Sequence, residues 1–180
     1  MNWTREYLSI ILILFLTGCA TNPIDFSKTK PLPQGEAIVF GRVNVIYKGE
    51  PKVWKGIPPY TPFQILVLPT ASKEAYSFAL LDDGSFYWHL SPGSYAISGF
   101  QWTGGSGGGT KSGRIFAEFV VPEDKSFVYI GKLTLDFDRT YHYTMRIEND
   151  YERAIQNFKN KFPEIKDEPT QNLMKFEVLK

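Results

Sequence analysis

Most of this chain alternates between apolar and polar residues with a period of two, which is the pattern of half-buried β-strands. The alternation is cleanest in 141–148, where every second residue from Tyr141 to Ile147 is apolar. It also runs through 37–47, where the internal Gly41 indicates a bulge or a close approach of another backbone. The full set of predicted strands is 37–47, 63–68, 76–81, 85–90, 95–102, 114–121, 127–137 and 141–148.

Turn residues separate these strands. Asp82-Asp83-Gly84 predicts a tight turn that pairs 76–81 with 85–90 as a β-hairpin, and Ser91-Pro92-Gly93-Ser94 predicts the next turn. A glycine-rich stretch at 103–113 predicts a flexible hairpin loop, and the proline-rich stretch 49–62 predicts a second loop.

The period becomes helical after residue 148. Apolar residues recur at helical spacing over Asp150–Lys161, and Pro163 ends the pattern. Asn149 and Glu152 have the spacing of a capping box. The apolar stripe consists of Tyr151, Ile155, Phe158 and Phe162. We therefore expect one amphipathic helix that packs this stripe on the sheet, followed by a short last strand near 175–179.

Short strands separated by turns every 8–12 residues or so favour a mainly β fold, either an antiparallel β-sandwich or a barrel. We expect the antiparallel β-sandwich, with about 7–8 strands and one C-terminal amphipathic helix, in a single domain over residues 36–180. The pattern does not specify the order of the strands in the sheets.

The N-terminus has a different character. Residues 8–16 are apolar apart from Ser9, and a helix of this length spans only about 14 Å, roughly half of a bilayer core. The run is too short for a permanent membrane span and is typical of the apolar region of a signal peptide. It ends in Leu16-Thr17-Gly18-Cys19, and Cys19 is the only cysteine of the chain. This arrangement resembles the lipobox of bacterial lipoproteins.

The lipoprotein resemblance implies where the chain is cut and what anchors it. The signal peptide 1–18 is removed between Gly18 and Cys19, and Cys19 then carries a diacylglycerol on its thiol and an acyl chain on its amine. Two or three acyl chains anchor a protein stably, whereas one gives only marginal membrane binding. Ala20, in place of an aspartate after the cysteine, implies the outer membrane. Residues 19–35 form the lipidated N-terminus and a flexible tether.

Three short motifs in the strand region resemble a second family. They are Gly41-Arg42-Val43, Asp83-Gly84-Ser85-Phe86 and Leu90-Ser91-Pro92-Gly93-Ser94-Tyr95. Together they resemble the carboxypeptidase regulatory-domain-like family, whose fold is a transthyretin-like β-sandwich. The match covers roughly residues 37–100, and its motifs are those of turns. The resemblance implies a non-catalytic accessory or binding module and carries over no functional residues.

Composition limits the partners. A net charge of +1 gives no overall electrostatic basis for binding nucleic acid. Aromatic residues make up 16% of the chain, which suits strands and either a large core or an aromatic binding face. We expect the partners to be the membrane, through the lipid anchor, and an envelope protein or glycan. The expected location is the cell envelope, facing the periplasm or the cell exterior.

The sequence contains no clear motif for catalysis or metal binding. The glycine-rich stretch imitates a phosphate-binding loop, but Thr110 separates the last glycine from Lys111, and a strand pattern follows. His89 and His142 both fall opposite the more apolar face of their strands, so we expect them at the surface, and ligands clustered for a metal are not evident. No serine lies in a nucleophile elbow. We expect no enzymatic activity, no metal, and no cofactor beyond the covalent lipid.

The main hypothesis is a lipid-anchored, non-catalytic module that acts in protein interaction or envelope architecture. The alternative is a carbohydrate-binding module, because aromatic faces on sandwich domains stack on sugar rings. Trp54 and Trp102 lie in or beside loops and are the candidate stacking residues, with Gly107 and Lys111 of the glycine-rich loop as further ligand contacts. Trp88 is expected in the core.

Overall fold

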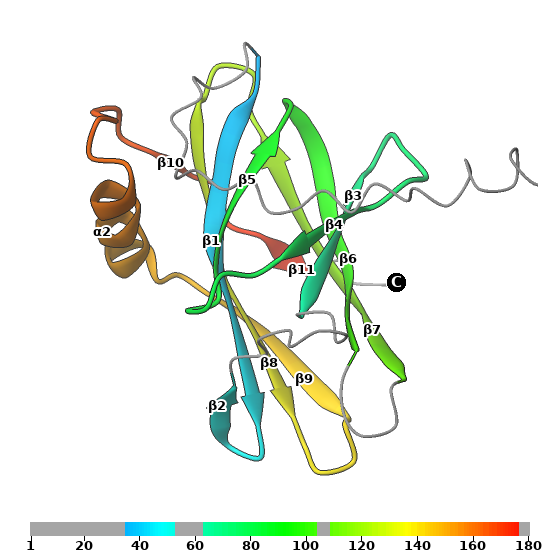
Figure 1. Ribbon diagram of the computed structural model, residues 1–180. Helices are drawn as coiled ribbons and strands as arrows, with labels where there is room; N and C mark the ends of the chain where they lie inside the picture. The colour runs from blue at the N-terminus through cyan, green and yellow to red at the C-terminus, as the bar shows by residue number, and fades with distance from the viewer. Residues whose placement is uncertain (1–34, 53–62, 104–108, 177–180) are drawn as a thin grey trace, which may run out of the picture.

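The computed structural model describes residues 35–52, 63–103 and 109–176, which form a two-layered β-sandwich with one helix on its outer side (Figure 1). The mainly β fold predicted from the sequence is confirmed. The elements in chain order are β1 (Ala37–Tyr47), β2 (Glu50–Lys52), β3 (Gln64–Pro69), β4 (Tyr76–Ala79), β5 (Ser85–Leu90), β6 (Gly93–Thr103), β7 (Thr110–Val121), β8 (Phe127–Phe137), β9 (Tyr143–Glu148), α2 (Tyr151–Lys161), β10 (Thr170–Gln171) and β11 (Lys175–Phe176). No helix within this part of the chain is long and apolar enough to cross a membrane.

The first sheet is built around β1 and β8, which run parallel to each other. β5 and β2 pair with successive parts of the free edge of β1, and β10 and β9 do the same for β8. The predicted antiparallel β-sandwich is confirmed in most of its strand pairs, and the parallel exceptions are β1–β8 and the short pair β10–β8. The chain leaves β1, builds most of the second sheet, and re-enters beside β1 in the same direction, which a long connection allows and a tight turn does not.

The second sheet has the strand order β11-β7-β6-β3-β4, and its neighbouring pairs are antiparallel. β6 and β7 form the predicted hairpin around the glycine-rich loop. Their pairing extends to Thr103 and Thr110, so the strands are longer than the sequence pattern indicated.

The predicted hairpin at Asp82-Asp83-Gly84 is wrong. The turn itself forms, because Gly84 has a φ of +81° and its N–H donates to the Leu81 carbonyl at 2.8 Å. However, β4 pairs with β3 in the second sheet, whereas β5 pairs with β1 in the first. The turn therefore connects the two sheets. The partner of each strand is set by which side chains it buries in the core, and not by the turn.

A bulge beside Gly41 sets the register of the first sheet. The β1–β8 pairing shifts between Phe40 and Arg42, where β8 carries one extra residue at Gly131, with a φ of +103°. The buried residues Val128 and Ile130 therefore share the inner face with Leu133 and Leu135, although the two pairs are out of step in sequence. The prediction of a bulge or a close approach at Gly41 is confirmed as a close approach, because the extra residue lies on β8 and a Cβ at Gly41 would collide with the Gly131 carbonyl oxygen.

Helix α2 packs its apolar stripe on the outer face of the first sheet, as predicted. Phe158 is 1% exposed and stacks on Phe40 of β1, with ring centroids 4.6 Å apart. Ile155 and Phe162 are buried in the same cluster. The predicted capping box does not form, since the N-cap position is Asp150, and Asn149 instead accepts a hydrogen bond from the Tyr151 N–H at 3.1 Å.

Several boundaries differ from the predictions. Strand β2 lies at the start of the predicted loop 49–62, because Lys48 and Gly49 form a two-residue turn with φ values of +56° and +81°. Only Lys175–Phe176 of the predicted strand 175–179 is described. The signal peptide 1–18 and Cys19 lie outside the described residues, as does almost all of the tether 19–35.

Candidate functional site

One end of the sandwich is organised by the loop between β8 and β9. The Asp138 carboxylate accepts hydrogen bonds from the Thr140 backbone N–H at 2.7 Å, the Thr140 hydroxyl at 2.8 Å and the His142 backbone N–H at 3.0 Å. These donors, those of Thr140 above all, lower the pKa of the Asp138 carboxyl. Residues 141 and 142 belong to this loop and not to the strand, so β9 begins at Tyr143, two residues later than predicted.

The loop lays the ring of Tyr141 across the end of the sandwich. Tyr141 stacks on Tyr47 of β1 with ring centroids 5.4 Å apart, and the Lys111 ammonium of β7 lies 3.3 Å from the centroid of the Tyr141 ring. Lys48 follows Tyr47 and places its own ammonium 5.0 Å from the Tyr47 ring centroid. We call these four residues the Tyr141 cluster. It joins the first sheet to the second, and Tyr141 remains 40% exposed.

The backbone of the Tyr141 cluster is strained. Lys48 and Tyr141, with φ values of +56° and +65°, are the non-glycine residues of the described chain in the left-handed region. Side chains other than glycine, asparagine and aspartate rarely adopt this conformation, and it is often found where a function requires it. A side-chain hydrogen bond with Tyr47, and then a side-chain hydrogen bond with Lys111 and its positive charge, lower the pKa of Tyr141.

Trp102 is a core residue, and its prediction as an exposed stacking residue is wrong. It is 5% exposed and packs against both Phe63 and Phe100, with ring centroids 5.6 and 5.7 Å away. Its alternation with Phe100 places both rings on the inner face of β6, although it lies near the end of the strand. Tyr141 lies over the same region, 6.5 Å from Trp102.

The remaining predicted residues have different outcomes. Lys111 is at the surface end of the sandwich and belongs to the Tyr141 cluster. Trp54 and Gly107 lie outside the described residues. Trp88 is 2% exposed, which confirms its prediction as a core residue. Tyr47 and Tyr141 were not predicted as site residues. The Asp138 side chain accepts a hydrogen bond from the Thr140 N–H, which is an Asx turn. An aspartate two residues before a threonine could have predicted this turn, and with it the loop that exposes Tyr141.

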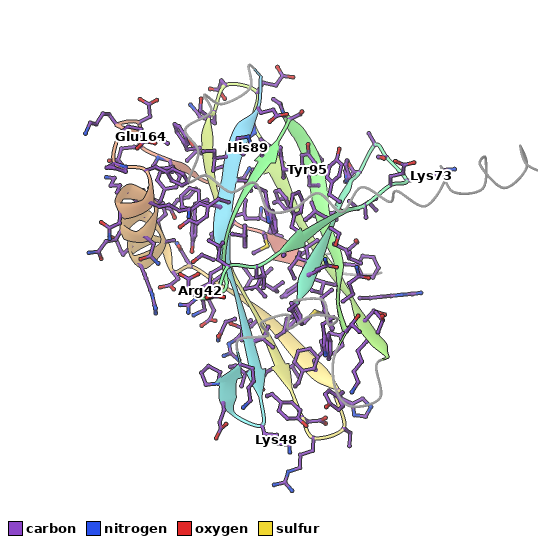
Figure 2. The ribbon with its side chains drawn as sticks, viewed as in Figure 1. Arg42, Lys48, Lys73, His89, Tyr95 and Glu164 are labelled. Carbon is purple, nitrogen blue, oxygen red and sulfur yellow. The ribbon has the colours of Figure 1, made fainter. Side chains whose placement is uncertain are left out.

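A hollow of about 370 Å³ adjoins the Tyr141 cluster. Of the cluster, Lys48 lines this hollow, together with Asp136, Asp138 and His142, whereas Lys111 does not. It therefore offers carboxylate acceptors and an ammonium donor within one open depression. Figure 2 shows Lys48 at this end of the sandwich, far from His89 at the opposite end.

A second hollow, of about 560 Å³, lies between α2 and the Asp82-Asp83-Gly84 turn. Tyr87 contributes to its lining, together with Asn157, Asn160 and Lys161 of the helix. Burial, and then the charge of Asp83, raise the pKa of Tyr87 to about 12, so its hydroxyl stays protonated at neutral pH. This hollow is a polar crevice at the contact of helix and sheet.

The two histidines do not form a shared site. His89 pairs with Ile38 near the start of β1, whereas His142 adjoins Tyr143, which pairs with Phe137 opposite the end of β1. At about 3.3 Å per residue, these positions lie roughly 30 Å apart. The His89 side chain is only 7% exposed, so its prediction as a surface residue is wrong, while the His142 side chain is 87% exposed. The described residues contain no group of three or more potential metal ligands.

His142 contacts a hydroxyl and a carboxylate, but not in the geometry of a catalytic triad. Thr140 Oγ1 lies 3.0 Å and Asp138 Oδ2 lies 3.6 Å from the same ring nitrogen, Nδ1. A triad needs the nucleophile and the orienting acid on opposite nitrogens, so that the ring can take one proton while the acid holds the other. These contacts therefore shape the loop.

Comparison with known proteins finds no matching family model, no similar curated protein and no similar solved structure. The function must therefore be argued from the residues of this chain.

Proposed function

We propose that this chain is a lipid-anchored, non-catalytic protein of the bacterial cell envelope, whose β-sandwich is an interaction or structural module. The observation that carries the proposal is Leu16-Thr17-Gly18-Cys19 behind a short apolar run. The thiol of Cys19 stands where bacterial lipoproteins are alkylated, and Ala20 after it favours the outer membrane. The turn motifs at 83–86 and 90–95 support an accessory module of the transthyretin-like kind.

The arrangement of the sandwich is compatible with such an anchor. β1 begins at Ala37, directly after the tether, and runs to Tyr47 at the other end of the sheet. The Tyr141 cluster therefore lies at the end of the domain opposite to the attachment of the tether (Figure 1). An anchored domain of this kind can present the cluster away from its own membrane.

Metabolic labelling with a fatty acid tests the anchor. The wild-type chain should incorporate the label, and Cys19→Ala should lose it and keep its signal peptide, because no other thiol is available. Thr21→Ala, a change two residues further on, should be labelled as the wild type is. An unlabelled wild-type chain, or a labelled Cys19→Ala variant, would contradict the proposal.

A second candidate function is carbohydrate binding at the Tyr141 cluster. It is favoured by the 40% exposure of Tyr141 beside a lysine, since aromatic rings and polar side chains together bind sugars. Retention of the full-length protein on insoluble peptidoglycan tests it. Tyr141→Ala should abolish retention, while Tyr76→Ala, at a tyrosine that is 44% exposed elsewhere on the surface, should not.

A further inference from the structure

The two lysines of the Tyr141 cluster are held in place by aromatic rings. The Lys48 and Lys111 ammoniums lie 5.0 and 3.3 Å from the centroids of the Tyr47 and Tyr141 rings. Within the described chain, no ion pair joins either ammonium to a carboxylate. A cation on a ring face is oriented but not neutralised, so its outward N–H groups can still meet an anion.

Two cations on the strands of the first sheet are paired with a carboxylate. Lys132 and Arg146 both lie within 3.4 Å of the Glu148 carboxylate, on the outer face of the same sheet. Lys48 and Lys111 differ from these two cations, because their ammoniums lie on tyrosine rings and not against a carboxylate.

The adjoining hollow supplies acceptors for hydroxyl groups. Asp136 and Asp138 line it together with Lys48, and its volume of about 370 Å³ falls in the range of pockets for small ligands. Asp138 Oδ1 is committed to the loop, but carboxylate oxygens accept more than one hydrogen bond. A ligand that fills the hollow therefore needs several donors of its own.

We propose that the Tyr141 cluster and the hollow beside it bind an acidic saccharide. Its carboxylate or phosphate is met by the ammonium of Lys48 at the hollow, the positive charge of Lys111 on the neighbouring ring adds to the attraction, and its hydroxyls donate to Asp136 and Asp138. The proposal rests on the carbohydrate-binding candidate above and names the class of sugar. An inorganic anion would contact only the lysines, and a neutral sugar would contact only the aspartates. An acidic saccharide contacts both.

Binding to the full-length protein in detergent micelles tests this assignment. The probes are a trimer of galacturonic acid, its neutral methyl ester, glucose 6-phosphate and inorganic phosphate. The acidic trimer or glucose 6-phosphate should bind, and the one that binds more tightly identifies the acidic group. The methyl ester and inorganic phosphate should each bind at least about tenfold more weakly, because each lacks one half of the recognised chemistry.

Two variants locate the site. Lys111→Gln should weaken binding of the acidic probe by about tenfold and reduce its dependence on salt, while binding of the methyl ester stays unchanged. Lys73→Gln, at a surface lysine far from the cluster (Figure 2), should behave as the wild type. Far-UV circular dichroism confirms that both variants are folded.

Three results would overturn the proposal. Equal affinity for the acidic trimer and its methyl ester would remove the acidic preference but leave carbohydrate binding intact. If no saccharide binds, both the acidic preference and carbohydrate binding are ruled out. The same holds if only inorganic phosphate or an anionic phospholipid vesicle binds. Full acidic binding by Lys111→Gln would place the site elsewhere. None of these results affects the labelling test of Cys19.

Discussion

The Lys111 ammonium lies 3.3 Å from the centroid of the Tyr141 ring and so links β7 of the second sheet to the β8–β9 loop of the first. Tyr47 stacks on the same ring from β1. The open end of the sandwich is thus closed by a polar and aromatic contact at its surface, above the buried rings of Phe100 and Trp102.

The ionisation of Tyr141 reports on this contact. Tyr47→Phe removes the hydrogen bond that most lowers the pKa of Tyr141, but it keeps the stacked ring. We expect the pKa of Tyr141 to rise towards its ordinary value of 10.0. Titration of ¹³C-labelled tyrosine rings by NMR measures it. Tyr76→Phe, outside the cluster, should leave the pKa of Tyr141 unchanged, and an unchanged value in Tyr47→Phe would show that the two hydroxyls do not interact.

Gly41→Ala should disrupt the bulge of the first sheet. A Cβ at this position would collide with the Gly131 carbonyl oxygen and lie 2.7 Å from Cζ of Phe86. Overpacking of this kind costs about 2–3 kcal/mol of the free energy of unfolding. Chemical denaturation measures the loss. Gly49→Ala is the control, because a Cβ there meets no atom within 4 Å and only the φ of +81° opposes it, at a cost of about 1 kcal/mol.

Helix α2 should depend on one aromatic side chain. Phe158→Ala removes a ring that is 1% exposed and packs against Phe40 and Phe127, which should cost about 3–4 kcal/mol. Gln156→Ala, on the exposed side of the helix, should change the free energy of unfolding by less than about 0.5 kcal/mol. Similar losses in both variants would show that the helix is not held by its apolar stripe.

The buried His89 should make the domain less stable in acid. Burial lowers the pKa of His89 below its ordinary value of 6.5, and the neighbouring Glu36 offsets only part of this effect. The unfolded chain therefore takes up the proton at a higher pH than the folded chain does. The stabilisation is complete above about pH 6.5 and is lost as the pH falls towards the lowered pKa.

Thermal denaturation at about pH 7.5 and about pH 5.5 measures this effect. The difference in Tm between the two pH values should shrink in His89→Gln, which cannot be protonated. His142→Gln is the matched control, because the His142 side chain is 87% exposed, and it should keep the wild-type difference. If His142→Gln shrinks the difference as much as His89→Gln does, the acid sensitivity has another source.

Local pattern predicted the strands well because apolar stretches bounded by turn residues form strands. The stretches 37–47 and 127–137 gave the bounds of β1 and β8, which bury residues on both faces, and the helical stripe gave α2. The pairing of β4 with β3 and of β5 with β1 was not predictable from the Asp82-Asp83-Gly84 turn, since a turn specifies a reversal of the chain and not which sheet accepts the next strand.

The candidate site was only partly predictable for a related reason. Lys111 was identified from the glycine-rich loop, but its neighbours Tyr47 and Tyr141 are distant in sequence and meet only through the folding of both sheets. Trp102 was assigned to the surface because it borders a loop. Its alternation with Phe100 was the better guide, because residues two apart on a strand share a face.

The central claim is the lipid on Cys19, and the mass of the mature protein extracted from the membrane tests it most directly. We predict an N-terminal peptide that begins at Cys19 and carries the added mass of a diacylglycerol and an N-acyl chain. An N-terminal peptide that begins at Met1, or one in which Cys19 has a free thiol, would contradict the account.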